Sequence, residues 1–414
     1  MADEWETVEL GEVAAVRSGY AFKSSDWQNA GIPVVKIANV KGGRLEMSGC
    51  SFVAKSIAAD SGEFQLSTGD ILIAMTGYIG DVARVRKTDL PCVLNQRVGK
   101  FSVRDNKRLD ADFLYTFLAW AETRQTIEAL GYGSAQPNIS PSLIHKIELP
   151  LPPLAEQKAI AAVLGALDDK IELNRRMNAT LEAMARELFQ SWFVDFDPVR
   201  AKFVGRKPIG LDETTAALFP DSFQESSLGL IPKGWEVKTL GEVIELAYGK
   251  PLKAEDRKNG PVCVYGSNGS IGWHDEKLVA GPGIVVGRKG NPGVVTWAHG
   301  DFYPIDTTFY VEPIGACRSL YFFYYALSLH NLANLSADSA VPGLNRNHAY
   351  MSKQVIPSQP VLTAFDSQIG PIFAFIHANE KQSRTLATLR DTLLPKLLSG
   401  ELSATANLLA STKS

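Results

Sequence analysis

The chain has 414 residues, of which 45% are hydrophobic and 21% charged, so it is long enough for two or three domains and ordinary for a globular protein. No apolar run approaches the roughly 18 residues that a membrane-spanning helix needs. The net charge of −3 weighs mildly against a nucleic-acid-binding protein without excluding one, because a local basic surface can coexist with acidic faces elsewhere.

Cysteine usage indicates the compartment. The four cysteines, Cys50, Cys92, Cys263 and Cys317, lie far apart and form no CxxC pair. This pattern suits a reduced cytosol and provides neither a disulfide framework nor a zinc site. The first ten residues, MADEWETVEL, are acidic and contain no apolar signal segment. We therefore expect a cytoplasmic protein.

The first predicted element begins a segment that the chain repeats. WETVELGEV at Trp5 matches WEVKTLGEV at Trp235 in six of nine positions, 230 residues apart. This period is too long for a solenoid unit and indicates two copies of a whole domain. The offset later falls to 213 and then to 205, because the first copy carries about fifteen extra residues between Val40 and Gly69. Differing specificity is expected in such a divergent loop region.

The repeat predicts an alternation of globular domains and long helices. The globular parts are rich in glycine, β-branched residues and turn signals, which predicts a mixed α/β fold. Within the first of them, residues 110–130 predict a single amphipathic helix. The expected segments are a first globular domain (1–149), a first long helix (150–193), an ordered but irregular connector (194–234), a second globular domain (235–354), a second long helix (355–402) and a flexible tail (403–414).

Both long helices carry apolar residues at spacings of three and four, with two polar interruptions in the first. Two such helices bury their seams when they pack as an antiparallel coiled coil, which the pseudo-two-fold relation of the copies favours. The seam residues are Leu164, Leu167, Ile171, Asn174, Leu181 and Leu188 in the first helix and Ile372, Ile376, Asn379, Leu386 and Leu393 in the second.

Asn174 and Asn379 occupy equivalent seam positions in the two copies. A buried polar seam residue fixes the pairing of two helices at some cost in stability, so both asparagines are candidate register markers. The alternative is that both lie at the edge of the seam and are solvated.

Signatures of catalysis are scarce. The chain has no GxxxxGK[ST] phosphate-binding loop, and its six histidines show neither HxxxH nor HExxH spacing. Asp306 is a possible nuclease carboxylate, but we align it with Asn95 in the first copy, and an asparagine does not replace a general base. The sequence therefore predicts a non-catalytic chain that binds no metal and no cofactor.

Polar, basic and aromatic residues gather in the glycine-rich loops of both copies. Asparagine, glutamine and arginine can form bidentate contacts with base edges, while lysines and loop N–H groups can hold phosphates. Each loop alone is more simply explained as an ordinary polar turn, and it is their recurrence in both copies that favours DNA binding. The candidates are Lys36, Asn39, Lys41, Tyr78, Gln96, Arg97, Tyr132, Gln136 and Asn138 in the first copy and Tyr265, Ser267, Asn268, Arg288, Lys289, Asn291, Asn345 and Arg346 in the second.

Four segments resemble a known family. They are LPLPPLAEQKAIAAVLGALDDKIELN (149–174), LFQSWFVDFDPVRAK (188–202), GLIPKGWEVKTLGEV (229–243) and LLPKLLSGEL (393–402). Together they resemble the DNA specificity subunit of a type I restriction–modification system, and the resemblance covers essentially the whole chain. The second long helix departs from the pattern, because PSQPVLTAFDSQ replaces the PPLAEQ start.

The resemblance implies that each globular domain is a target recognition domain that binds one half of a bipartite, asymmetric DNA site. It implies that the helices set the gap between the half-sites and bind two modification subunits, which use S-adenosylmethionine to methylate adenine. A restriction subunit that uses ATP with Mg²⁺ is the further expected partner.

Two other classes remain open at this point: a protein–protein scaffold or adaptor built on the coiled coil, and a nuclease with an unrecognised site. The recognised bases do not follow from the loop residues, because side chains and DNA shape act together.

Overall fold

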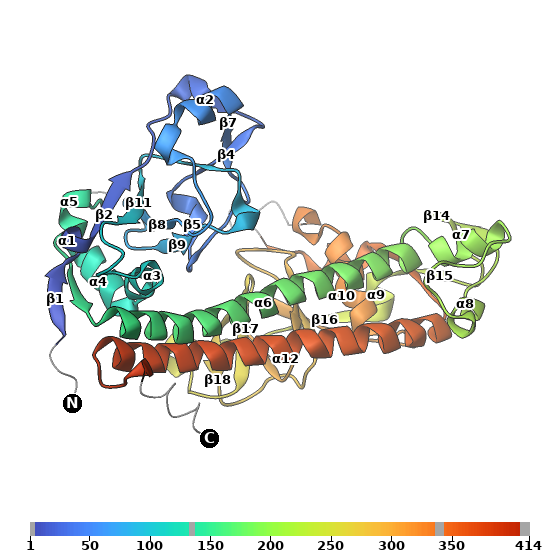
Figure 1. The fold of residues 1–414 in the computed structure, drawn as a ribbon. Helices are drawn as coiled ribbons and strands as arrows, with labels where there is room; N and C mark the ends of the chain where they lie inside the picture. The colour runs from blue at the N-terminus through green and yellow to red at the C-terminus, as the bar shows by residue number, and fades with distance from the viewer. Residues whose placement is uncertain (1–4, 132–136, 336–342, 406–414) are drawn as a thin grey trace. The chain divides into compact units, whose positions relative to one another are not determined.

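The computed structural model describes residues 5–131, 137–335 and 343–405. The chain divides into two compact units. The first contains Met1–Glu172 and Ser383–Ser414, and the second contains Leu173–Gln382. Each unit therefore holds one globular domain and a part of each of two long helices, α6 (Leu154–Phe193) and α12 (Gln359–Leu398) (Figure 1).

The globular part of the first unit combines short strands and helices. Its strands are β1 (Glu6–Glu9), β2 (Ala14–Ser18), β3 (Trp27–Gln28), β4 (Ile32–Val35), β5 (Val40–Lys41), β6 (Arg44–Leu45), β7 (Ser51–Val53), β8 (Ile71–Ala74), β9 (Val82–Arg84), β10 (Val93–Leu94), β11 (Val98–Val103) and β12 (Glu148–Leu151). Its α-helices are α1 (Leu10–Val13), α2 (Lys55–Asp60), α3 (Ala111–Ala119), α4 (Ala121–Leu130) and α5 (Pro141–Ile144).

An antiparallel sheet in the order β2-β11-β8-β9 is the centre of this unit. Strand β8 is buried along its whole length. The hydrophobic core to which it contributes also includes Phe113 and Leu114 of α3 and Ile160 and Leu164 of α6. Strand β1 pairs with β12, so the two ends of the globular domain lie together where α6 begins. The mixed α/β fold is confirmed.

The prediction of one helix over 110–130 is wrong. Trp120 has an extended backbone, φ −69° and ψ 137°, so α3 ends at Ala119 and α4 begins at Ala121. Its ring is partly buried and packs against the core of the unit, and no proline or glycine marks the break in the sequence. Helical periodicity continues across Trp120, which is why the pattern suggests one helix.

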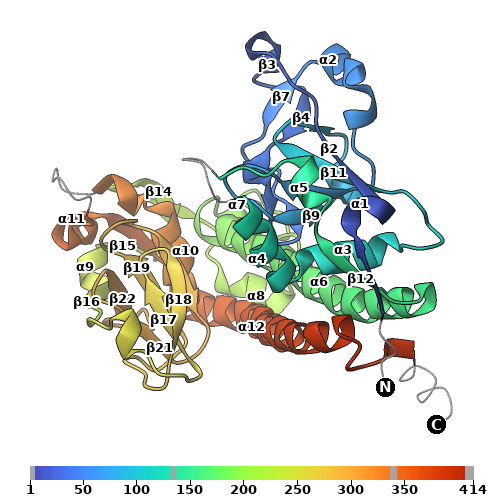
Figure 2. The ribbon, with the colours of Figure 1, turned by 90° about the vertical axis from the view of Figure 1, so that its left-hand side faces the viewer.

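The extra residues of the first copy form two separate additions. The first contains the β5–β6 hairpin, and the second contains α2 after β7. Helix α2 lies with β3, β4 and β7 at the end of the unit remote from α6 (Figure 2).

The second unit repeats this plan with different additions. Its strands are β13 (Phe223–Ser226), β14 (Gly229–Pro232), β15 (Glu236–Thr239), β16 (Ile244–Tyr248), β17 (Val262–Gly266), β18 (Gly269–His274), β19 (Gly283–Gly287), β20 (Val295–Ala298), β21 (Phe302–Pro304), β22 (Thr308–Pro313) and β23 (Lys353–Ile356). Its shorter helices are α7 (Asp197–Phe203), α8 (Glu213–Leu218), α9 (Leu240–Val243), α10 (Leu320–Leu329) and α11 (Arg346–Met351).

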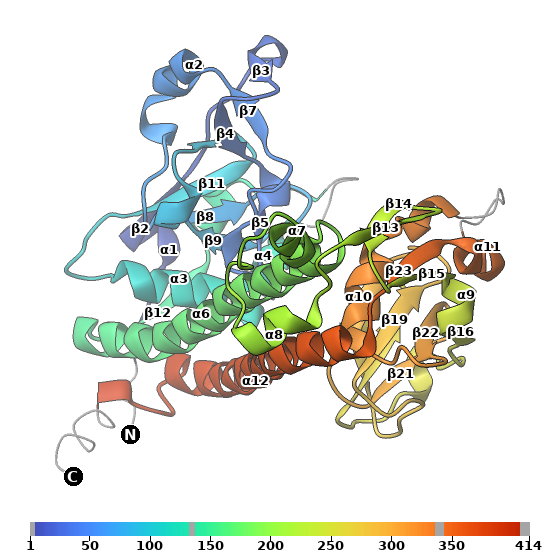
Figure 3. The same cartoon turned by 90° about the vertical axis from the view of Figure 1, so that its right-hand side faces the viewer.

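The central sheet of the second unit has the order β16-β22-β19-β20, which matches β2-β11-β8-β9 strand for strand. Helix α10 packs against this sheet (Figure 3). Aromatic residues dominate the core, where the rings of Phe189, Phe193, Phe322 and Phe365 contact one another. The connector is more regular than predicted, because it contains α7, α8 and the β13–β14 hairpin.

The two long helices are antiparallel within each unit. In the first unit, the Asp168 carboxylate accepts from Arg390 Nη1 at 2.7 Å. In the second unit, Asn174 Nδ2 donates to Gln382 Oε1 at 2.9 Å, whereas Asn178 Nδ2 donates to the Ile376 carbonyl at 3.3 Å. A later residue on α6 thus contacts an earlier residue on α12, so the two helices run antiparallel and the predicted antiparallel coiled coil is present.

The seam asparagines are buried. Asn174 Nδ2 also lies 3.4 Å from the Asn379 carbonyl oxygen, and Asn379 Nδ2 donates to Asn178 Oδ1 at 2.8 Å. The solvated alternative is therefore wrong, and both amides bind across the helix pair. The apolar seam residues are all buried or half-buried, namely Leu164, Leu167, Ile171, Leu181 and Leu188 of α6 and Ile372, Ile376, Leu386 and Leu393 of α12.

The start of the predicted flexible tail is held in place. The carboxylate of Glu156, in the first turn of α6, accepts from the main-chain N–H groups of Ala404 and Thr405 and from the Ser403 hydroxyl. These hydrogen bonds outweigh the opposing effect of burial and lower the pKa of Glu156. Residues 403–405 therefore pack on the first unit.

By length and composition, α12 meets the usual criterion for a membrane-crossing helix, and within the described ranges no other helix does. A third of its most apolar stretch is buried, and Val361, Leu362, Phe365 and Ile369 contribute to the aromatic-rich core of the second unit.

Candidate nucleic-acid interface

The repeated LGEV segments form the same short helix in both units, α1 and α9. A side chain at Gly11 would place its Cβ 2.8 Å from His145 Cβ, and one at Gly241 would lie 3.0 Å from Tyr350 Cβ. Glycine is repeated here because a side chain from elsewhere in the domain packs directly on the turn.

His145 and Tyr350 perform the same structural task with different chemistry. His145 Nε2 accepts the Val16 main-chain N–H at 3.1 Å, and the Tyr350 hydroxyl accepts that of Leu246 at 2.9 Å. Burial, together with the nearby Arg104, lowers the pKa of His145, which favours the neutral ring that can accept. The central sheets are thus anchored at equivalent points.

Main-chain hydrogen bonds define which loop residues correspond. Met75 N–H donates to the Arg97 carbonyl at 3.1 Å, as Arg288 N–H donates to that of Thr307 at 2.9 Å. The Met75 carbonyl then accepts from Ile139, as the Arg288 carbonyl accepts from Leu344. Met75 therefore corresponds to Arg288.

The helices that follow correspond as well. Ser140 is the N-cap of α5 and Asn345 that of α11, so Pro141 corresponds to Arg346, the first residue of its helix.

Two further main-chain hydrogen bonds correct the alignment of Asp306 with Asn95. Val98 N–H donates to the Asn95 carbonyl and Thr308 N–H donates to that of Ile305. Asn95 thus corresponds to Ile305, and Asp306 corresponds to Gln96. The offset between copies is 210 at this strand, which an alignment of short motifs does not resolve.

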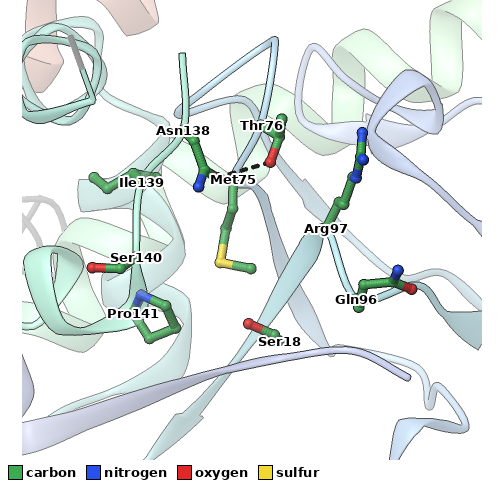
Figure 4. A pocket seen from close by; sticks show the side chains of 9 residues that line it. All are labelled: Ser18, Met75, Thr76, Gln96, Arg97, Asn138, Ile139, Ser140 and Pro141. Carbon is green, nitrogen blue, oxygen red and sulfur yellow. Dashed lines mark hydrogen bonds between the residues drawn. The ribbon is translucent and has the colours of Figure 1, made fainter. Parts of the chain in front are cut away.

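In the first unit, the loops around Met75 and Pro141 line a pocket of about 540 Å³. Gln96 and Arg97 lie on one side of it, Asn138 to Pro141 on the other, and Met75 between them (Figure 4). The Thr76 hydroxyl donates to Asn138 Oδ1 at 2.9 Å, and Gln96 Oε1 accepts from Asn95 Nδ2 at 3.1 Å. The lining residues are Ser18, Met75, Thr76, Gln96, Arg97, Asn138, Ile139, Ser140 and Pro141.

In the second unit, two arginines and a tyrosine occupy the corresponding positions. The guanidinium carbons of Arg288 and Arg346 lie 4.9 and 5.0 Å from the centre of the Tyr248 ring. Arg288 Nη1 also donates to the Asp306 carbonyl at 2.9 Å, and Arg346 Nη1 to the Leu246 carbonyl at 3.3 Å. These contacts hold both guanidinium groups at the ends of the central strands. We call Tyr248, Arg288 and Arg346 the arginine–tyrosine cluster.

Tyr248 was not among the sequence candidates, although its side chain is 51% exposed. Its correspondence with Ser18 of the first copy is the signal that could have identified it, because the repeat has a small residue there in one copy and an aromatic residue in the other.

Many of the remaining candidates lie at the surface, where DNA could contact them. The exposed ones are Lys41, Tyr78, Gln96, Arg97, Asn138, Asn268, Lys289 and Asn291, and Ser267 is half-buried. Tyr132 and Gln136 lie outside the described residues.

Four candidates have structural roles instead. Asn39 is buried, and its amide accepts from Lys36 N–H and donates to the Glu46 carbonyl. Tyr265 is buried against Phe302 in a small core, so it is unsuited to a surface contact. The Asn345 side chain caps α11. Lys36 is half-buried, donates to the Ser51 hydroxyl at 2.7 Å and lies over the Trp27 ring. The cap that Asn345 forms is local, whereas the other three side chains also contact residues beyond their own turn, which local sequence does not reveal.

In the ranges that the structure describes, no group of three or more His, Cys, Asp or Glu side chains could hold a metal ion. The histidines that contact each other, His299 and His377, stack with ring centres 5.1 Å apart.

The fold and these loops define a class: two related recognition domains joined by an antiparallel pair of long helices. A family model described as "Type I restriction modification DNA specificity domain" matches residues 2–183 and 232–358. The chain belongs to this family, and the two matched segments correspond to its two copies.

Named relatives agree with this placement. The chain is 27% identical over 358 residues to the type I restriction enzyme MjaIX specificity subunit of Methanocaldococcus jannaschii, covering 81% of this chain and 78% of that protein. It is also 27% identical over 359 residues to the HindI specificity subunit of Haemophilus influenzae, covering 70% of this chain and 77% of that protein. The fold is similar to the crystal structure of the S subunit of a type I restriction–modification system from M. genitalium, with a TM-score of 0.59, 20% identity and 96% of each chain covered.

Proposed function

We propose that this chain is the DNA-recognition subunit of a type I restriction–modification complex, in which each globular domain binds one half of a bipartite, asymmetric site. The observation that carries the proposal is the repeated framework with unlike side chains at one locus. Gly11 with His145 and Gly241 with Tyr350 hold the same backbone, whereas Met75 and Arg288 present different chemistry at the ends of equivalent strands. Such a pair of domains suits two unlike half-sites.

The chain performs no chemistry of its own in this proposal. Two modification subunits bind the helix pair, bring S-adenosylmethionine and methylate adenine, and a restriction subunit adds ATP- and Mg²⁺-dependent cleavage. The pseudo-two-fold arrangement allows two identical subunits to bind one chain equivalently. We propose that the complex acts in the cytoplasm, on the cell's DNA. The two helices, each 40 residues long, set the number of base pairs between the half-sites.

Family membership leaves little support for a scaffold without DNA binding or for a nuclease within this chain. Co-expression with its modification subunit, followed by sequencing of methylated adenines, tests the proposal directly. We expect one bipartite motif, and the absence of any such motif would overturn the proposal. A chimaera in which another such domain replaces residues 235–354 should change one half-site, and a change in both half-sites contradicts the modular assignment.

A further inference from the structure

The arginine–tyrosine cluster carries more positive charge than its surroundings neutralise. Arg288 and Arg346 share one aromatic ring, and in the described part of the chain neither forms an ion pair with a carboxylate. Both guanidinium groups lie about 5 Å from the same ring centre, so their positive charges oppose each other, and the ring quadrupole compensates only in part. Such an arrangement suits a ligand that presents acceptors or negative charge.

The contacts of each arginine leave most of its hydrogen-bonding groups available. A guanidinium has five N–H donors, and one Nη atom of each arginine donates to a main-chain carbonyl. The contact with the Tyr248 ring and the bond to a main-chain carbonyl restrict each group, so less conformational entropy is lost when the remaining donors bind. Tyr248 is half exposed, so the cluster is open to a partner.

The comparison of the two units separates two kinds of DNA contact. A phosphate contact can form with any DNA sequence, so two domains that share a framework are expected to make it with corresponding residues. A base contact must differ between domains that recognise different half-sites. Tyr248, Arg288 and Arg346 correspond to Ser18, Met75 and Pro141, which offer neither an aromatic ring nor a guanidinium group. The cluster thus lies at a point where the side-chain chemistry of the two units differs.

We infer that the arginine–tyrosine cluster is the specificity-determining site of the second domain and that it recognises the major-groove edge of a guanine, through the O6 and N7 acceptors that arginine binds in a bidentate manner. This inference rests on the proposed function. The corresponding locus of the first unit holds Gln96, Arg97 and Asn138 around its pocket, so base discrimination there uses a different donor set.

Replacement of arginine by lysine tests this inference, because it keeps the positive charge and removes the planar fork. Arg288→Lys and Arg346→Lys are each expressed with the modification subunit, and the methylated motif is sequenced. We expect one guanine in the second half-site to become degenerate, with discrimination lower by about tenfold to a hundredfold. The first half-site stays unchanged.

The matched control is Arg318→Lys, an exposed arginine of the same unit outside the cluster, and it should leave the motif unchanged. An unaltered motif with methylation lowered evenly at all sites would show phosphate contacts and overturn the inference. A change in the first half-site would also overturn it. If the wild-type complex yields no bipartite motif, the proposed function fails instead, so the two failures are distinguishable.

A DNA-side measurement keeps the inference testable should either variant fail to fold. The wild-type complex is titrated with duplexes in which each guanine of the second half-site is replaced by 7-deazaguanine, which lacks the N7 acceptor. We expect one replacement to weaken binding about tenfold. A second half-site without guanine, or equal binding to all the modified duplexes, refutes the inference.

Discussion

The two units share their backbone geometry but differ in the side chains that this backbone carries. At the sheet anchor, His145 in one unit and Tyr350 in the other accept equivalent main-chain N–H groups, so the geometry is kept while the residue changes. At the ends of the central strands, a pocket beside Met75 in the first unit corresponds to the arginine–tyrosine cluster in the second. The repeat therefore constrains backbone positions and leaves the ends of the strands free to diverge.

The glycines after β2 and β16 give the strongest test of the shared framework. A Cβ at Gly19 would lie 2.5 Å from the Asn95 carbonyl oxygen, and one at Gly249 would lie 2.2 Å from that of Ile305. Each carbonyl accepts a main-chain N–H, that of Val98 or of Thr308, and moving it would break this bond. We therefore expect Gly19→Ala and Gly249→Ala each to destabilise its own unit by about 3 kcal/mol. Hydrogen exchange of peptides from each unit measures the loss.

The matched control is Gly300→Ala, since an added Cβ there meets nothing within 4 Å. If the loss from Gly19→Ala spread equally through both units, or if Gly249→Ala were neutral, the two frameworks would not be equivalent as described.

This framework could be predicted from the sequence in outline only. Matching glycines at 11 and 241 revealed the repeat, and the helical periodicity of both long helices indicated the coiled coil, because apolar spacing reports directly on burial. The contact of Tyr265 with Phe302 could not be predicted, since Phe302 lies on a strand distant in sequence, and the burial of Asn39 depends on how its own loop folds back onto Glu46. Tyr248 was missed because its significance depends on the two arginines whose guanidinium groups lie over its ring, and they come from distant segments.

The buried amides of the helix pair offer a second test. Asn174→Ala removes the donor to Gln382 Oε1 and to the Asn379 carbonyl, and we expect it to cost about 2 kcal/mol. Asn379→Ala, at the equivalent position of the second copy, leaves Asn178 Oδ1 without this donor and should cost a similar amount. Denaturant titration of both single variants and the double variant measures the coupling. Additive losses would show that the two amides do not act as one network.

The contact between each globular domain and a long helix differs between the units. Arg86 Nη1 lies 2.7 Å from Glu172 Oε1 in the first unit, whereas the corresponding residues of the second unit are His299 and His377. Burial, reinforced by His377, lowers the pKa of His299 to about 4, although the Glu380 carboxylate lies 3.6 Å away and would favour the charged ring. His299 is therefore neutral at pH 7.

A histidine whose pKa is lower in the folded state binds a proton more readily when unfolded. The stability that it contributes is complete above its ordinary pKa of about 6.5 and is lost as the pH falls toward about 4. We expect the second unit to lose roughly 1–2 kcal/mol between pH 7 and pH 5 from this group. Hydrogen exchange of peptides from β20 and α12 at both pH values measures it. His299→Gln should remove this dependence, and an unaltered pH profile would contradict the assignment.

The smallest expected effect distinguishes the two long helices. Gly165 in α6 and Gly370 in α12 are equivalent in the repeat, and an added Cβ meets nothing within 4 Å at Gly165 and only the Tyr321 hydroxyl, at 3.7 Å, at Gly370. Alanine in a helix interior is favoured over glycine by about 0.5–1 kcal/mol, so Gly165→Ala should stabilise the first unit by that amount. Pro371 follows Gly370, and a Cβ before proline disfavours the helical backbone, so Gly370→Ala should gain less. Equal gains, measured as shifts of the denaturation midpoint, would show that Pro371 imposes no such restriction on α12.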